Sequence, residues 1–175
     1  MKKISFLGIT IIFCLVLSFT IKVKADEFQF EKLLYDIGYK EVNKAYMEST
    51  NHFKRDIALP SQLPPIAFTH NLGRFSNLEG NANDSFQITY LNKDIAQNHY
   101  QIRVKPVKYK LEFSKEKIDH KVKLNDGSEA IYSTKMPLDL LAFEKNEWQY
   151  ILLVDKRISK SVSLKVLVDI ANSVQ

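Results

Sequence analysis

The sequence predicts an α+β fold: an antiparallel meander sheet of about six or seven strands, with an N-terminal helical region and a C-terminal helix packed on one face. Apolar residues recur at helical spacing through residues 26–56, alternate with polar residues from Ile66 onward, and return to helical spacing in Val162–Val174. Alternation gives each strand one dry and one wet face, which is typical of antiparallel sheets. We expect the apolar stripes of the helices to cover the dry face.

Residues 1–25 have the pattern of a secretory signal peptide. Lys2 and Lys3 give a basic start, residues 4–21 contain no charge, and Val23 and Ala25 supply the small residues of a cleavage site. We therefore expect a secreted protein, or one held in the cell wall or at the extracellular face.

Two alternatives to cleavage remain open. The uncharged run of 18 residues reaches the lower range for a membrane span, so the segment could stay as an uncleaved N-terminal anchor. Cys14, the only cysteine, could carry a lipid, but the bulky Phe13 precedes it where lipoprotein signals place a small residue.

Cleavage after Ala25 would leave a nearly neutral chain without cysteine, residues 26–175. Disulfides, thiolate metal sites and cysteine nucleophiles are then excluded. The signal removes four lysines and no acid, so 25 basic and 20 acidic residues become 21 and 20. This balance does not favour a nucleic-acid partner. About 150 residues suffice for one core, and we expect 26–175 to form one folded unit.

The helical region spans residues 26–58, and the sheet domain spans residues 59–175. Gly38 breaks or bends the helical stripe, and three prolines in 60–65 end it. Gly73 suggests a turn, and the segments 125–128 and 144–147 suggest hairpins. The expected strand segments are Ile66–Phe68, Phe86–Tyr90, Tyr100–Val104, Tyr109–Phe113, Val122–Leu124, Ala130–Tyr132, Leu138–Phe143 and Trp148–Val154.

The chain is expected to close with a helix at Val162–Val174. Ser163 is the candidate N-cap residue, because its hydroxyl could accept a hydrogen bond from a free amide of the first turn. Leu164, Leu167, Val168 and Ala171 form the stripe that should pack on the sheet.

Four segments within residues 59–175 carry a resemblance. They are Leu-Pro-x-x-Leu-Pro-Pro-Ile-Ala-Phe-Thr-His-Asn-Leu-Gly-Arg-Phe (59–75), Leu-Asn-Asp-Gly-Ser-Glu-Ala-Ile-Tyr (124–132), Leu-Ala-Phe-Glu-Lys-x-x-Trp-Gln-Tyr (141–150) and Leu-Val-Asp-Ile-Ala-Asn-Ser (167–173). Together they resemble a family of exported proteins from Gram-positive, Bacillus-type bacteria that share a C-terminal domain of unknown function. The resemblance covers most of residues 59–175 and implies an envelope location and an α+β fold. It implies no catalytic residue, and the family's lipoprotein members differ from this chain at Phe13.

The sequence contains no recognisable catalytic or cofactor motif. The nucleophile elbow, the phosphate-binding loop and the zinc-binding helix motif are all missing. We interpret the four histidines, His52, His70, His99 and His120, as surface or loop residues. We therefore expect no catalytic residue, no metal and no cofactor, although an enzyme is not excluded.

Two features suggest contacts with a ligand or partner. His70 and Arg74 lie in a polar and aromatic segment placed by the proline linker; Arg74 could equally pair with a carboxylate and lock that linker to the sheet. Arg103–Lys123 holds eight basic and three acidic residues on what we expect to be adjacent strands. Its candidate contacts are Arg103, Lys105, Lys108, Lys110 and Lys121.

Such a patch would suit an anionic cell-wall polymer, a membrane surface or another envelope protein. Lysines on an exposed sheet also protect its edges from pairing. The sequence thus favours an exported cell-envelope protein that acts as a non-enzymatic binding or sensing domain. A structural protein-interaction module, or a carrier of an apolar ligand in a half-barrel cavity, remains the alternative; a filled core would disfavour the carrier.

Overall fold

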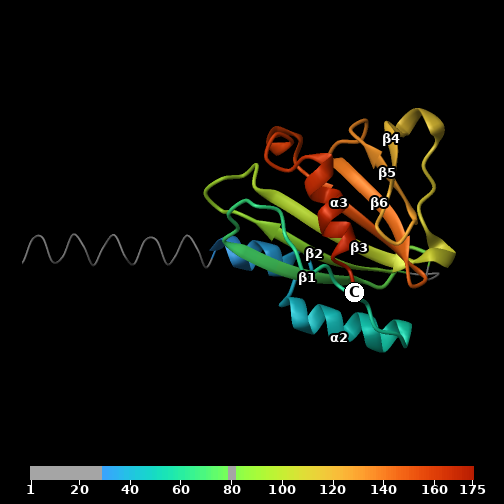
Figure 1. Cartoon of the computed structure of the whole chain (residues 1–175). Helices are drawn as coiled ribbons and strands as arrows, with labels where there is room; N and C mark the ends of the chain where they lie inside the picture. The colour runs from blue at the N-terminus through green and yellow to red at the C-terminus, as the bar shows by residue number, and fades with distance from the viewer. Residues whose placement is uncertain (1–28, 79–81) are drawn as a thin grey trace, which may run out of the picture. The chain divides into compact units, whose positions relative to one another are not determined.

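The computed structural model describes residues 29–78 and 82–175 (Figure 1). The predicted signal peptide at 1–25 lies outside these described residues. Within the described ranges, no helix is both long and apolar enough to cross a membrane. Residues 29–36 are helical, and the helix ends at a turn where Gly38 has φ of 93°. This conformation is easy only for glycine and confirms the predicted break.

Residues Tyr39–Gln175 form one compact unit around a seven-stranded antiparallel sheet. The strand order is β1-β2-β3-β7-β6-β5-β4, so two meanders, β1–β3 and β4–β7, join where β7 pairs with β3 (Figure 1). This confirms the α+β class. The strands are β1 (His70–Ser76), β2 (Ser85–Leu91), β3 (His99–Pro106), β4 (His120–Lys123), β5 (Glu129–Ser133), β6 (Asp139–Lys145) and β7 (Trp148–Val154).

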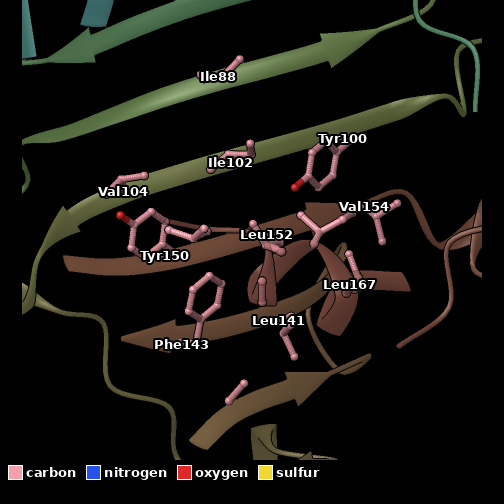
Figure 2. Packing of buried hydrophobic residues seen from close by; sticks show 14 of the residues in the cluster. Ile88, Tyr100, Ile102, Val104, Leu141, Phe143, Tyr150, Leu152, Val154 and Leu167 are labelled. Carbon is pink, nitrogen blue, oxygen red and sulfur yellow. The ribbon is translucent and has the colours of Figure 1, made fainter. Parts of the chain in front are cut away.

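Two helices pack on the same face of the sheet, which we name the helix face. Helix α2 (Val42–Phe53) lies against β1 and β2, and α3 (Leu164–Asn172) lies against β6. Alternate residues of the strands meet the helices in one continuous core, in which Leu167 is fully buried. Figure 2 shows Leu167 beside Leu141, Leu152 and Val154, which belong to β6 and β7.

Both predicted hairpins are confirmed. Gly127, with φ of 84°, closes the turn between β4 and β5 by donating its amide to the Leu124 carbonyl at 3.0 Å. Asn146 and Glu147 connect β6 to β7, and both have positive φ, as a tight two-residue hairpin requires.

The predicted turn at Gly73 is wrong, because Gly73 lies in the middle of β1. Its hydrogen faces α2, and a Cβ placed there would lie 2.6 Å from the Cβ of Ala45 and 2.9 Å from the Cα of Val42. The backbones of Gly73 and Lys40 also exchange two hydrogen bonds of 2.8 Å. Glycine is needed here for close approach, not for turning.

Two predicted strands are absent from the described structure. Residues 66–68 belong to the irregular linker after the prolines. In the segment 109–113, Tyr109 ends a 3-10 helix at Val107–Tyr109, and the residues after it do not pair into the sheet. Instead, residues 107–119, which we name the strap, run from β3 to β4 over the sheet surface opposite the helices. We name that surface the strap face. Phe113 of the strap packs there against the cluster of Leu140, Ala142 and Ile151.

The segments that flank the sheet are tied to its helix face. The indole of Trp148 donates to the Asp56 carbonyl at 3.0 Å, and the hydroxyl of Tyr150 donates to the Ala58 carbonyl at 3.0 Å. Helix α3 is shorter than the predicted Val162–Val174. Ser163 occupies its predicted N-cap position, although its side chain makes no capping hydrogen bond.

Candidate functional site

Three long polar side chains stand in one row across β1, β2 and β3 on the strap face. Arg74 lies opposite Gln87, and Gln87 lies opposite Arg103. The next row places Thr89 opposite Gln101. We name the set Tyr39, Arg74, Gln87, Thr89, Gln101 and Arg103 the arginine cluster.

A hydrogen-bond network organises the base of the arginine cluster. Gln87 Nε2 donates to Tyr39 Oη at 2.8 Å and to Thr89 Oγ1 at 3.1 Å. Gln101 Nε2 donates to Thr89 Oγ1 at 3.2 Å. Both glutamines thus turn their amide oxygens towards Arg103, whose Nη2 donates to them at 3.4 and 3.3 Å. Gln87, Thr89 and Gln101 are buried, so they form a positioning layer below the guanidinium of Arg103.

Within the described residues, the side chains that contact the two guanidinium groups are neutral. The Arg74 guanidinium lies 5.8 Å from the centroid of the Tyr39 ring, within cation–π range, and Arg74 is exposed. Among the ion pairs of the described residues, none joins Arg74 or Arg103 to a carboxylate. The alternative in which Arg74 locks the linker through a carboxylate therefore gains no support from these contacts.

Lys105 adds a third cation two residues beyond Arg103 on the same face of β3. Its side chain is buried, and its Nζ donates to the Ala82 carbonyl at 3.1 Å. Burial lowers the pKa of Lys105, and the positive charge of Arg103 lowers it further. A buried ammonium beside a guanidinium is held at an energetic cost, which a bound anion would relieve.

The remaining sequence-predicted residues are distributed over the molecule. His70 stands on the strap face of β1, with Nδ1 2.7 Å from the Thr69 hydroxyl. Lys108 is exposed, with Nζ 5.2 Å from the centroid of the Tyr109 ring. Lys121, on β4, forms an ion pair of 2.6 Å with Glu129.

Lys110 lies in the strap, where its Nζ is 2.9 Å from Glu144 Oε1 and 3.5 Å from Glu112 Oε1. The hydrogen bond to Glu144 and the charges of both glutamates raise the pKa of Lys110. This lysine is therefore satisfied by acidic partners within the chain.

The structure changes how the two sequence-predicted groups of candidate contacts are arranged. It brings Arg74 together with Arg103 and Lys105, because β2 alone separates β1 from β3. The expectation that the basic residues of Arg103–Lys123 lie on adjacent strands is wrong. β7, β6 and β5 lie between β3 and β4, a separation of roughly 19 Å at the usual strand spacing.

Sequence reasoning missed the contact between His52 and a buried carboxyl group. Asp84 is fully buried between β1 and β2; its Oδ1 accepts the Leu78 amide at 2.8 Å, and its Oδ2 lies 2.8 Å from His52 Nε2. His52 also contacts the ring of Phe75, with centroids 5.0 Å apart. No sequence pattern links His52 to Asp84, which lies 32 residues further along the chain. The sequence therefore indicated only a surface histidine at position 52.

The arginine cluster is suited to binding an anion. Guanidinium groups present several N–H donors in a plane, which matches carboxylate and phosphate oxygens. Within the described residues, no group of three or more His, Cys, Asp or Glu side chains is placed to hold a metal ion. Comparisons with protein-family models, with curated proteins and with solved structures found no match.

Proposed function

We propose that this chain is an exported bacterial cell-envelope protein that binds an anionic ligand without chemical conversion, through the arginine cluster and Lys105. The observation that carries the proposal is the placement of three cations on β1 and β3 over neutral acceptors. Arg103 uses its Nη2 to donate to two glutamine oxygens, and its other guanidinium nitrogens can donate to a ligand. The signal pattern of residues 1–25 supports the envelope location.

The spacing of the cations favours a ligand with repeated charges. Arg74 and Arg103 stand two strands apart, roughly 10 Å at the usual strand spacing. Successive phosphates of a polymer could each meet one of these two guanidinium groups, with Lys105 further along the same face. An anionic cell-wall polymer of the teichoic-acid type is therefore the ligand that we propose.

The packing of the helix face favours this proposal over the apolar carrier. The largest side chains of the core, Trp148, Tyr100 and Tyr150, are buried there among aliphatic residues from both helices and five strands. Carriers instead enclose a space lined by apolar side chains. An interaction module that binds only another protein is the outcome if polymer binding fails.

The binding test is co-sedimentation of the purified protein with teichoic-acid-type polymer at low and high salt. We expect binding at low salt that fades as the Debye length falls from about 10 Å at 0.1 M to about 3 Å at 1 M. The double variant Arg74→Gln, Arg103→Gln should lose most of the binding. The matched control Lys44→Gln, Lys160→Gln removes two exposed charges elsewhere and should bind like the parent.

Two results would count against the proposal: equal binding by the parent and the arginine variant, or no binding by the parent at low salt. Anionic vesicles in a parallel arm separate a wall polymer from a membrane surface. N-terminal sequencing of the exported protein tests the location, with Asp26 as the expected first residue. An intact Met1 on membrane-bound protein would favour the anchor, and lipid on Cys14 would favour a lipoprotein.

A further inference from the structure

The other half of the strap face contains a cavity of about 400 Å³ between the strap and β5–β6, separate from the arginine cluster. We infer that this cavity binds an organic cation with an apolar stem, the chemistry shared by an alkylammonium ion and a lysine side chain. The argument rests on how the strap is held, what the floor is made of and where the carboxylates stand.

One side chain of the sheet holds the strap at a fixed height. Gln149 Oε1 accepts the Leu111 amide at 2.8 Å, and Gln149 Nε2 donates to the Leu111 carbonyl at 2.9 Å. The side-chain amide thereby replaces a neighbouring strand and satisfies both backbone groups of Leu111. Phe113 packs further along against the cluster of Leu140, Ala142 and Ile151, so the strap is fixed at two points.

The floor and one wall of the cavity are apolar. Ile131 and Ala142 pair across β5 and β6 and form the floor, while Leu111 and Phe113 contribute from the strap. Leu111 is 43% exposed, which is high for a leucine beside an apolar floor. A ligand that brought an apolar stem into this space would remove this surface from water.

The charged groups of the cavity are mainly acidic. Ala130 pairs with Phe143, so the next residues, Glu129 and Glu144, stand side by side. Adjacent like charges on neighbouring strands are unfavourable unless cations are close. Three glutamates and one lysine line the space: Glu112, Glu129, Glu144 and Lys110.

The existing ion pairs leave acceptor capacity in the cavity. Glu129 is neutralised by Lys121 and Glu144 by Lys110. Among the ion pairs of the described residues, Glu112, whose side chain is 80% exposed, takes part only in the longer contact of 3.5 Å to the same Lys110. A ligand ammonium near Glu112 would neutralise the remaining negative charge of the cavity. An anion would instead be repelled by three carboxylates.

The volume fits a small ligand or one side chain with its backbone, because small-molecule sites start near roughly 300 Å³. The apolar floor selects the stem and the carboxylates select the charge. Neither a bare metal ion nor a neutral hydrocarbon uses both parts of the lining.

The test uses three probes of six carbons each: hexylammonium, hexanol and hexanoate. Binding to the full chain is followed by the NMR shifts of the Ile131 and Ala142 methyl groups, with Ile88 on the helix face as internal reference. We expect saturable shifts with hexylammonium, roughly fivefold weaker binding of hexanol, and no binding of hexanoate. A blocked Ala-Lys-Ala peptide distinguishes a lysine side chain from a free amine.

Two variants test the lining separately. Glu112→Gln changes an exposed residue and should weaken hexylammonium binding about twofold to fivefold, the size of an exposed ion pair. Ile131→Trp should fill the floor and abolish binding. Asp94→Asn, an exposed acid in the β2–β3 turn, is the matched control and should bind like the parent.

The inference is overturned if the floor methyls do not respond to hexylammonium, or if hexanoate binds as well. Unchanged binding by Glu112→Gln also overturns it, and this exposed substitution decides the matter if Ile131→Trp does not fold. The polymer-binding proposal is unaffected by either result, because its residues lie on β1 and β3.

Discussion

The two halves of the strap face differ in charge although they belong to one sheet and share one core. Over β1–β3, Arg103 contacts two glutamines, Arg74 lies over the Tyr39 ring, and Lys105 donates to the Ala82 carbonyl. Over β5–β7, glutamates are paired with lysines above an apolar floor, and the strap covers them. One scaffold thus presents an open cationic surface and a covered acidic cavity.

The alternation within individual strands explains this difference. In β2 and β3, most strap-face positions are polar, as at Gln87, Gln101 and Arg103. In β6 and β7, both faces are apolar, so Leu140 and Ile151 are buried although they point away from the helices. Strands that are apolar on both faces need a second cover, and the strap supplies it.

The largest expected effect comes from Leu167→Asp, which tests whether the halves share one core. An unpaired charge at this fully buried position should lower the free energy of unfolding by roughly 3 to 5 kcal/mol, by analogy with broken buried ion pairs. Methyl signals of Ile88 in β2 and Ile131 in β5 should be lost at the same denaturant concentration.

The matched control for this substitution is Lys165→Asp on the exposed side of α3, which should cost less than about 1 kcal/mol. If only the Ile131 signal is lost in Leu167→Asp, the two halves are independent folding units.

Gly73→Val should disturb the cationic half alone. A β-branched side chain at Gly73 must displace Ala45 or the backbone of Val42, and overpacking of this kind costs roughly 1 to 3 kcal/mol. We expect β1 and Arg74 to shift, polymer binding to fall and hexylammonium binding to persist. Thermal unfolding measures the loss of stability, which should be smaller for Gly73→Ala than for Gly73→Val. If both variants are as stable as the parent, α2 can move away from β1 without an energetic cost.

Lys105→Met should separate stability from binding. Removing a buried cation whose pKa is lowered by burial should raise the free energy of unfolding, by about 1 kcal/mol on the scale of buried ions replaced by apolar residues. Polymer binding should fall at the same time. Lys123→Met, at an exposed position of β4, should change neither quantity appreciably. A destabilised Lys105→Met would instead assign the lysine a structural role.

Most of the fold could be predicted because local patterns decide it. The hairpins at Asp126-Gly127 and 144–147 depend on turn residues next to each other in the chain, and the stripe of α3 depends on spacing within three turns. Gly73 and residues 109–113 were misread because distant partners decide their structure. Helix α2 packs so close to Gly73 that this position has no room for a side chain. The side chain of Gln149 forms the two hydrogen bonds with the Leu111 backbone that a neighbouring strand would otherwise form.

The candidate site could be predicted only in part for the same reason. Arg74 and Arg103 were each recognisable as cations in polar surroundings. Their common row follows from the β1–β2–β3 register, which single strands do not reveal. The contribution of Tyr39 was not predictable, since it belongs to the segment between two helices and reaches the sheet through Gln87 and Thr89.

The smallest expected effect concerns pH and His99, at the start of β3 in the cationic half. Partial burial lowers the pKa of His99, and the charge of Asp155 opposes this in part. The unfolded chain therefore binds the proton more tightly than the folded one. Stability should fall as pH drops below the ordinary histidine value of about 6.5, and the loss should be complete below the folded pKa.

The measurement is the difference in unfolding free energy between the parent and His99→Gln, from urea titrations between pH 7.5 and 5. We expect the parent to lose stability relative to the variant as pH falls, because only the parent carries the buried imidazole. Other groups titrate in both proteins and cancel in the difference. A constant difference across this range would show that His99 is solvated as freely in the folded chain as in the unfolded one, and that this end of β3 is more open than its burial indicates.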